Sequence, residues 1–326
     1  MRELGRLEVA DQAPFRAFVR DARNGLAGAP RQLPSCYFYD DLGSSLFDAI
    51  CRLPWYRVTR AETRLLQRHA CEACKLTGPV TRIVELGPGS GEKLETLLDS
   101  GGVCTGRLDV HLVDVSVGAL EQASRRIGAR QRVRVAGHEA TYQEGLLDAT
   151  SGSQGPGQTL VLFLGSNIGN FDRATADALL RCVRKALSPR DAFLLGVDLI
   201  KPERELLRAY DDPLGVTSAF NKNLLCRLNR ELGADFDLQR FSHRAVWNAK
   251  DTRVEMHLVS LTEQRVRIAA ADLEFTLAEG ETIWTESSYK FDREDIVKRL
   301  KSAGFGLAKQ WVDEGAGFAL TLAMAE

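Results

Sequence analysis

The chain has 326 residues, of which 44% are hydrophobic and 27% charged, a composition that allows a large core and about two domains. Its 43 basic and 44 acidic side chains give a net charge of −1, so no overall positive field exists to hold a nucleic-acid backbone. No window approaches the roughly 20 uninterrupted apolar residues of a membrane-spanning helix, and the charged start is unlike a signal peptide. We therefore expect a cytoplasmic protein with no nucleic-acid and no membrane partner.

Seven cysteines, an odd number, are scattered through apolar or helical contexts, which favours reduced thiols. Cys71 and Cys74 have the spacing of half a zinc site, but no second pair of cysteines or histidines follows at a matching distance. Two cysteines one helical turn apart explain the spacing more simply. We therefore predict no metal site.

The first 35 residues are polar and compatible with a helix. Residues 37–69 predict a helix, a break at Pro54 and a second helix. The first of these helices has apolar residues at helical spacing: Leu46, Phe47, Ile50 and Leu53.

Between residues 80 and 200, short apolar runs alternate with helical stretches. The runs are typical of strands buried on both faces, and they cover residues 81–86, 108–113, 133–136, 159–164 and 192–197. Helical segments of crossover length separate most of them, which predicts a parallel, doubly wound sheet.

The rest of the chain, after residue 200, mixes helical and strand patterns. Residues 204–232 predict one helical run, and residues 244–261 predict two strands joined by a turn at 248–252. Two further strands are expected at 266–270 and 282–290, then a helix capped by Asp292 and a final strand at 317–323. We therefore predict an α/β fold: a Rossmann-like doubly wound domain over 62–200 plus 290–326, and an inserted α+β domain formed by 1–61 plus 201–289.

A glycine-rich turn, Gly87-Pro-Gly-Ser-Gly91, follows the first strand of the predicted sheet and opens a helix. Such a turn lets backbone N–H groups approach a ligand closely. Asp114 ends the next strand, where a carboxylate can accept both hydroxyls of a ribose. This spacing alone fits a dinucleotide or S-adenosylmethionine. The GxGxG pattern and Glu85 favour the latter, because a carboxylate suits a cationic cofactor and repels pyrophosphate.

Eight segments have a more specific character: FYDDLGSSLFDAICRLPWYRVTRAE, VELGPGSGEKLETLL, FLGSNIGNF, LLGVDLIKP, AYDDPLGVTSAFNKNLLCRLNRELGADF, VEMHL, TIWTESSYKF and GFALTLA. Together, in unbroken order from about Tyr37 to the end, they strongly resemble the histidine-specific Nα-methyltransferases of ergothioneine biosynthesis. The resemblance implies a methyltransferase domain, a histidine-recognition domain, and three methyl transfers from S-adenosylmethionine to the α-amine of L-histidine. The products would be hercynine and S-adenosylhomocysteine. We expect a monomer.

The resemblance also implies which residues hold the amino-acid end of histidine. Asn170 matches the asparagine that contacts the substrate's amine and carboxylate, and Gly165 opens the same motif. Tyr210 matches the tyrosine that hydrogen-bonds the carboxylate. Tyr39 matches the tyrosine near the amine, which we expect to orient it directly or through water. Tyr39 and Asn170 are therefore the expected catalytic residues.

Recognition of the imidazole ring is expected from residues 282–290. If this segment is extended, Trp284, Glu286 and Ser288 share one face. The Glu286 carboxylate could take a ring N–H and the Ser288 hydroxyl could serve the other nitrogen; the residues alone also allow a solvated strand face. The resemblance implies three further contacts to the ring: Tyr56, Phe47 and Met256.

The resemblance places the amino-acid end of the methyl donor near the glycine turn and Lys93. The expected cofactor contacts are Glu85, Gly87, Gly89, Lys93, Asp114, Ala140 and Thr141. The last two are expected at the adenine, where this chain lacks the Asp-Phe pair of many family members. Two further departures border the expected pocket without replacing a ligand: Arg57-Val-Thr where the family commonly has Tyr-Pro-Thr, and Asn167 where threonine is common.

Three other functions are compatible with parts of the sequence. An Nα-methyltransferase for tryptophan or a histidine derivative is disfavoured by Glu286, Ser288 and Met256, because an indole offers one donor and no acceptor. A catalytically idle S-adenosylmethionine-binding protein should have lost pocket residues, and every matched one is present. A nicotinamide oxidoreductase disagrees with the turn pattern and with Glu85.

Overall fold

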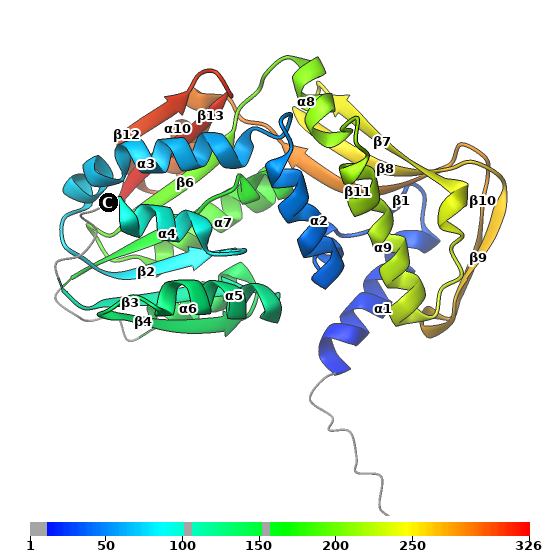
Figure 1. Ribbon diagram of the computed structural model, residues 1–326, viewed down its shortest axis with the longest axis horizontal. Helices are drawn as coiled ribbons and strands as arrows, with labels where there is room; N and C mark the ends of the chain where they lie inside the picture. The colour runs from blue at the N-terminus through cyan, green and yellow to red at the C-terminus, as the bar shows by residue number, and fades with distance from the viewer. Residues whose placement is uncertain (1–11, 101–105, 152–156) are drawn as a thin grey trace, which may run out of the picture. The chain divides into compact units, whose positions relative to one another are not determined.

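A computed structural model describes residues 12–100, 106–151 and 157–326 (Figure 1). The chain divides into two compact units, each assembled from separated stretches of sequence. The first unit holds the described residues up to Ile50, with Tyr210–Val246 and Val254–Glu286. The second unit holds Cys51–Ala209, Trp247–Arg253 and Ser287–Glu326. The domain boundaries predicted at residues 62, 200 and 290 are not tested by this division into units, and they stay a prediction.

The second unit is built on a seven-stranded sheet of order β12-β13-β6-β5-β2-β3-β4. The strands are β2 (Val80–Leu86), β3 (Leu108–Asp114), β4 (Val133–Glu139), β5 (Gln158–Phe163), β6 (Ala192–Asp198), β12 (Phe305–Asp313) and β13 (Phe318–Ala325). The five strands from β6 to β4 pair in parallel, whereas β13 runs antiparallel to both β6 and β12. The predicted parallel, doubly wound sheet is therefore confirmed.

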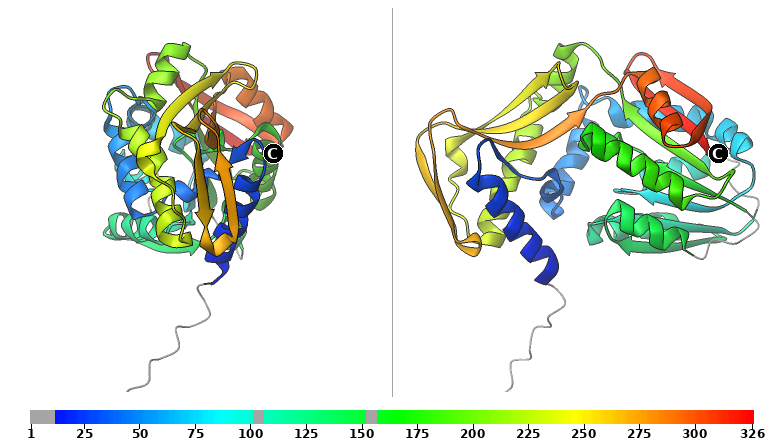
Figure 2. Two further views of the ribbon diagram at one scale, coloured as in Figure 1. Left: turned by 90° about the vertical axis from the view of Figure 1, so that its right-hand side faces the viewer. Right: turned by 180° about the vertical axis from the view of Figure 1, so that it is seen from behind.

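Helices cover both faces of this sheet. One face carries α3 (Val58–Thr77), α4 (Glu92–Asp99) and α5 (Val117–Gly128), and the other carries α6 (Tyr142–Thr150), α7 (Arg173–Ala186) and α10 (Arg293–Ser302). Figure 1 shows α3 and α4 in front of the sheet, and the reverse view in Figure 2 shows α7 and α10 in front. Every residue of β6 is buried, as expected for a strand covered on both faces.

The predicted cap of α10 is present. The Asp292 side chain accepts hydrogen bonds from the backbone N–H groups of Glu294 at 2.8 Å and Asp295 at 3.3 Å. These are two of the donors that have no partner within the first turn of a helix. The helix therefore begins where its local sequence specifies.

The first unit combines helices with a small sheet of order β1-β11-β8-β7. Its helical elements are α1 (Gln12–Ala27), η2 (Ser35–Phe38), α2 (Asp41–Arg52), α9 (Val216–Leu232), η4 (Leu238–Arg240) and η5 (Ala269–Ala271). Its strands are β1 (Arg31–Gln32), β7 (Phe241–Asn248), β8 (Arg253–Ser260) and β11 (Thr282–Tyr289), and a separate pair comprises β9 (Gln264–Ile268) and β10 (Leu273–Leu277). The strand ends at residues 247–248, 253 and 287–289 are counted with the second unit. The predicted strands around the turn at 248–252 and the extended segment at 282–289 are confirmed.

The prediction of one helical run over residues 204–232 is wrong. The structure has two helices, α8 (Glu203–Tyr210) and α9, with a turn between them. In this turn the Asp212 carboxylate accepts hydrogen bonds from the N–H groups of Leu214 at 3.0 Å and Thr217 at 2.7 Å. The physical reason is Pro213, which has no N–H to donate and disfavours helical backbone at the residue before it.

Among the described helices, none is both long enough and apolar enough to cross a bilayer.

Candidate active site

The glycine turn lies between β2 and α4, as predicted. Gly87 and Gly89 have φ angles of +72° and +54°, a left-handed conformation that side chains rarely adopt. The Gly87 N–H donates to the Val113 carbonyl at 2.8 Å, which ties the turn to the end of β3. A Cβ atom added to Gly89 would meet nothing within 4 Å. The turn therefore presents its backbone to open space, where a ligand can approach.

Glu85 lies at the end of β2 with 1% of its surface exposed. Its Oε2 atom has no hydrogen-bond partner within the described part of the chain. Burial raises the pKa of Glu85 to about 8; Lys93 opposes this rise, while the carboxylates of Glu62 and Asp114 add to it. A cationic ligand group would supply the missing partner and restore the ionised form. These residues fit the amino-acid end of S-adenosylmethionine, whereas a pyrophosphate would add a further negative charge.

Asp114 is the last residue of β3, and its Oδ1 accepts the backbone N–H of Ser116 at 2.9 Å. Burial raises the pKa of Asp114, although backbone N–H donors, including that of Gly89, act against the rise. The structure thus brings this carboxylate beside the glycine turn. Its contact with a ribose stays a prediction.

The expected adenine contacts follow β4. The Ala140 N–H donates to the Asp114 carbonyl at 3.2 Å, which places Ala140 next to the expected ribose carboxylate. Thr141 is the N-cap of α6: its hydroxyl accepts the Glu144 N–H at 3.4 Å and donates to the Glu144 carboxylate at 2.7 Å. The Thr141 side chain therefore already has a capping role, and its contact with adenine stays a prediction.

Glu62, which the sequence analysis missed, joins two predicted site residues. It is fully buried on α3, and its Oε2 lies 2.9 Å from Lys93 Nζ. The Gly165 N–H donates to both oxygens of the same carboxylate, at 2.9 and 2.8 Å. Burial alone would lower the pKa of Lys93, but the pairing with Glu62 outweighs it and leaves that pKa raised. Lys93 is therefore a cation held in place by Glu62.

The segment 165–170 reaches the glycine turn. It forms η3 (Asn167–Asn170), which follows β5, and Asn170 is half-buried at its end. A Cβ atom added to Gly87 would come within 2.7 Å of Asn167 Nδ2 and 2.9 Å of the Tyr142 hydroxyl. The structure therefore brings the segment that carries Asn170 beside the expected cofactor turn. It also adds Tyr142, the first residue of α6, which the sequence analysis did not single out.

Two of the predicted ring contacts, Tyr56 and Ser288, lie in the second unit and are 7% and 5% exposed. The Ser288 Oγ accepts a hydrogen bond from Lys290 Nζ at 2.9 Å. Lys290 in turn lies 2.9 Å from Asp198, and the Asp198 N–H donates to the Ser166 hydroxyl at 2.9 Å. Ser288 is therefore held by a buried network that the sequence analysis missed.

The other predicted substrate residues lie in the first unit. Tyr39 and Phe47 pack with Phe220 in an aromatic cluster, with ring centroids 5.7 to 6.0 Å apart. Tyr210 is buried, and its carbonyl lies 2.7 Å from His243 Nε2. Because a carbonyl only accepts, this nitrogen of His243 is the protonated one. The ring thereby fixes the backbone at Tyr210.

Met256 and Glu286 lie on adjacent strands of the same small sheet. Met256 on β8 is 1% exposed, and its carbonyl accepts the Thr285 hydroxyl at 3.0 Å. Glu286 is half-buried on β11, and the Trp284 ring N–H donates to its carbonyl at 2.8 Å. The extended geometry assumed for residues 282–289 is confirmed, while the contacts of Glu286 and Met256 with imidazole stay predictions.

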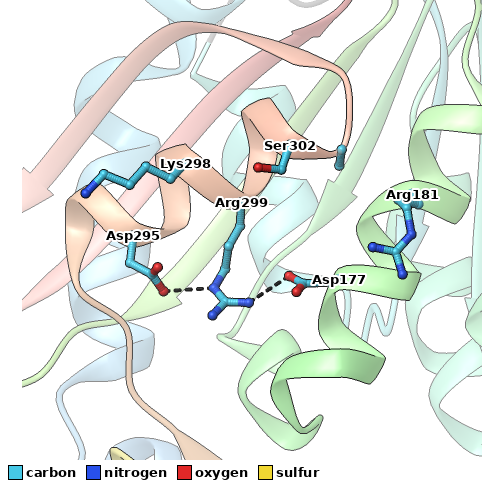
Figure 3. A pocket seen from close by; sticks show the side chains of 7 residues that line it. Asp177, Arg181, Asp295, Lys298, Arg299 and Ser302 are labelled. Carbon is cyan, nitrogen blue, oxygen red and sulfur yellow. Dashed lines mark hydrogen bonds and ion pairs between the residues drawn. The ribbon is translucent and has the colours of Figure 1, made fainter.

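A surface concavity of about 280 Å³ in the second unit is unrelated to these residues (Figure 3). In it Arg299 lies between two carboxylates, 2.8 Å from Asp295 and 2.7 Å from Asp177. None of the predicted site residues lines it. Elsewhere, neither Cys71 nor Cys74 on α3 forms a disulfide with another described residue. The described residues contain no cluster of three or more His, Cys, Asp or Glu side chains placed to hold a metal ion.

The parallel core with its antiparallel β13, together with the glycine turn and the buried Glu85, defines a Rossmann-like S-adenosylmethionine-dependent methyltransferase. A family model described as "Histidine-specific methyltransferase, SAM-dependent" matches residues 18–325. The chain therefore belongs to the histidine-specific, S-adenosylmethionine-dependent methyltransferases.

Named relatives agree with this family. The chain is 43% identical to a "Histidine N-alpha-methyltransferase" of Mycolicibacterium smegmatis, over 97% of each sequence. It is 38% identical to a protein of the same name from Mycobacterium tuberculosis, again over 97% of each. It is 29% identical to "Ergothioneine biosynthesis protein 1" of Neurospora crassa, over 86% of this chain and 32% of that protein.

Proposed function

We propose that this enzyme is an L-histidine Nα-methyltransferase that converts histidine to hercynine, the trimethylated product, in ergothioneine biosynthesis. The observation that carries the proposal is the similarity, over nearly the whole chain, to relatives named for histidine Nα-methylation. The residues expected to contact the imidazole ring support the proposal. They combine a carboxylate acceptor, a hydroxyl and apolar side chains, and a neutral imidazole has one N–H donor and one acceptor nitrogen.

S-adenosylmethionine, when bound, supplies a methyl group on a positively charged sulfur. The attacking α-amine has an ordinary pKa of about 8 or above and is mostly protonated at neutral pH, so it must lose one proton before each transfer. Each transfer forms an N–C bond and breaks the S–C bond, and S-adenosylhomocysteine leaves. We assign Asn170 and Tyr39 the task of aligning the amine lone pair with the methyl group. Three rounds release three protons and end with a quaternary nitrogen.

The remaining residues hold the substrate. We assign Tyr210 to the carboxylate, with Gly165 beside the amine, and Glu286 and Ser288 to the two ring nitrogens. The apolar contacts to the ring are assigned to Tyr56, Phe47 and Met256. In the second unit the cofactor is assigned to Glu85, Gly87, Gly89, Lys93, Asp114, Ala140 and Thr141. A small zwitterion needs only such a few placed groups, which is compatible with the net charge of −1.

We also propose that the enzyme works as a monomer in the cytoplasm, without nucleic-acid or membrane partners. Its substrate is a small free metabolite, so catalysis requires no extended docking surface. Sedimentation velocity of the purified protein tests the oligomeric state, and a dimer at low micromolar concentration would contradict the monomer.

The direct test is to incubate the enzyme with S-adenosylmethionine and each of the twenty amino acids and to read product masses. We expect trimethylated histidine and no other methylated product. A methylated product from a different amino acid would show that the assignment of histidine as the substrate is wrong. The absence of any product, in a protein that still binds S-adenosylmethionine, would identify a catalytically idle binder.

Replacing Glu286 by alanine should weaken histidine binding by about 1–3 kcal/mol, or roughly 5- to 150-fold, because the substrate's ring N–H then lacks its acceptor. Binding of S-adenosylmethionine should be unchanged. Calorimetry with each ligand measures both affinities. Glu279→Ala, which removes an exposed carboxylate from the same unit, is the matched control. Unchanged histidine affinity in Glu286→Ala would remove Glu286 from the ring site.

A further inference from the structure

A fully buried lysine lies directly behind Ser288. Lys290 is 0% exposed, and its Nζ lies 2.9 Å from Ser288 Oγ and 2.9 Å from Asp198 Oδ2. An ammonium group only donates hydrogen bonds, so in this contact the serine oxygen is the acceptor. The hydroxyl hydrogen of Ser288 must therefore point away from Lys290.

A second lysine contacts the carboxylate that pairs with Lys290. Asp198 is 2% exposed, and its second oxygen, Oδ1, lies 2.5 Å from Lys201 Nζ. Burial would raise the pKa of Asp198, but the two lysines outweigh it and leave that pKa below its usual value. Asp198 is thus ionised, and two ammonium groups share one carboxylate. A well-packed apolar pair would usually be at least as stable as a buried ion pair, so stability alone is a weak reason for this arrangement.

We propose that Lys290 is a positioning residue that makes the Ser288 hydroxyl a hydrogen-bond donor and thereby selects a neutral ring with an acceptor nitrogen. A hydroxyl that accepts from an ammonium group becomes a stronger donor, because the cation polarises its O–H bond. For the same reason it becomes a poorer acceptor for a second N–H. A ring carrying an N–H, or a cationic imidazolium, at this position would face an oxygen already bonded to a cation.

This inference rests on the proposed function, because Ser288 meets a ring nitrogen only if histidine is the substrate. It goes beyond that function by attributing the direction of the hydrogen bond to Lys290, a buried residue that contacts Ser288. Lys290 is a better target for substitution than Asp198. The Asp198 carboxylate pairs with both Lys290 and Lys201, so its replacement would disturb both lysines at once.

The test compares two ligands in the presence of S-adenosylhomocysteine: histidine, and a histidine analogue with a pyrrole ring, which keeps an N–H but has no acceptor nitrogen. Calorimetry gives both dissociation constants, and their ratio is the readout. We expect Lys290→Met to reduce the preference for histidine about tenfold, since it removes a charge-assisted contact. Lys290→Arg should retain most of the preference.

Lys201→Met is the matched control. It removes a lysine from the same aspartate, but Lys201 donates to the Ala316 carbonyl at 2.6 Å and not to Ser288. We expect the ligand ratio to stay unchanged in this variant. An equal fall of the ratio in Lys201→Met and Lys290→Met would show a general effect of charge or stability and would overturn the inference.

A double-mutant cycle with Ser288→Ala tests whether Lys290 acts through the serine. In the Ser288→Ala background, Lys290→Met should have no further effect on the ratio. An undiminished effect there would overturn the inference. Should Lys290→Met not fold, Lys290→Gln keeps the test decisive: its neutral amide should lower the ratio partway, and an unchanged ratio refutes the role. Wild-type protein that binds no histidine would instead refute the proposed function.

Discussion

Replacing Glu62 by leucine is expected to lower the free energy of unfolding of the second unit by about 3–5 kcal/mol, as for other broken buried ion pairs. The change leaves the Lys93 ammonium group, whose side chain is 24% exposed, without its carboxylate. It also leaves the Gly165 N–H without an acceptor. S-adenosylmethionine binding should weaken in parallel, because Lys93 and the turn lose their fixed positions. Chemical denaturation and calorimetry measure the two effects.

The control is Glu92→Gln on the neighbouring helix α4. Glu92 is 60% exposed and lies 3.4 Å from Arg126, and an exposed pair of this kind contributes about 0–1 kcal/mol. The double variant Glu62→Leu with Lys93→Met should recover much of the stability without recovering cofactor affinity. Equal stabilities of Glu62→Leu and Glu92→Gln would show that the buried pair does not hold this part of the fold together.

Binding of S-adenosylmethionine at pH 7 is expected to release up to about one proton from Glu85. Without cofactor the pKa of Glu85 is about 8, so the carboxyl is mostly protonated at pH 7. A cationic amino group beside it would favour the ionised form. Calorimetry in buffers of different ionisation enthalpy counts the released protons. Glu85→Gln should release none, and a wild-type enzyme that also releases none would separate Glu85 from the cofactor's amino group.

The same shift makes the stability of the cofactor-free protein depend on pH. A glutamate in the unfolded chain titrates at about 4.3, whereas native Glu85 keeps its proton up to about pH 8. Native protein therefore binds more protons than unfolded protein between these values, and stability should fall as pH rises from about 4.3 to 8. The fall is on the order of 1.4 kcal/mol per pKa unit. Denaturation of Glu85→Gln across this range should lack this component, and an identical pH profile would contradict the assignment.

Some elements escaped prediction because their local signals are weak. The strands β10 and β12 were not predicted. β12 lies at an edge of the sheet, and only Phe305 and Trp311 in it are buried, so it lacks the continuous apolar run that marked the five central strands. The turn at Pro213 was missed because the four-residue spacing of α9 was extended backwards past the proline. At this position the proline indicates the end of a helix more reliably than the spacing of apolar residues does.

The sequence by itself determined the structural features that depend on residues close together in the chain. Short apolar runs predicted the parallel strands, Asp292 predicted a helix start, and the glycine pattern predicted the turn between β2 and α4. These features depend on local periodicity, capping and backbone conformation, which a stretch of about ten residues already specifies. The motifs in order also identified the family, which the family match confirmed.

Only the tertiary structure decided which distant charges meet. Glu62 reaches Lys93 and Gly165, and Lys290 reaches Asp198, across intervals of sequence that carry no periodic or turn signal. Gly196 illustrates the point: in sequence it is a glycine inside a strand, but a Cβ there would lie 2.0 Å from the Glu62 carboxylate. The physical reason is that a buried ion pair depends on the packing of elements far apart in the chain, and local sequence does not encode that packing.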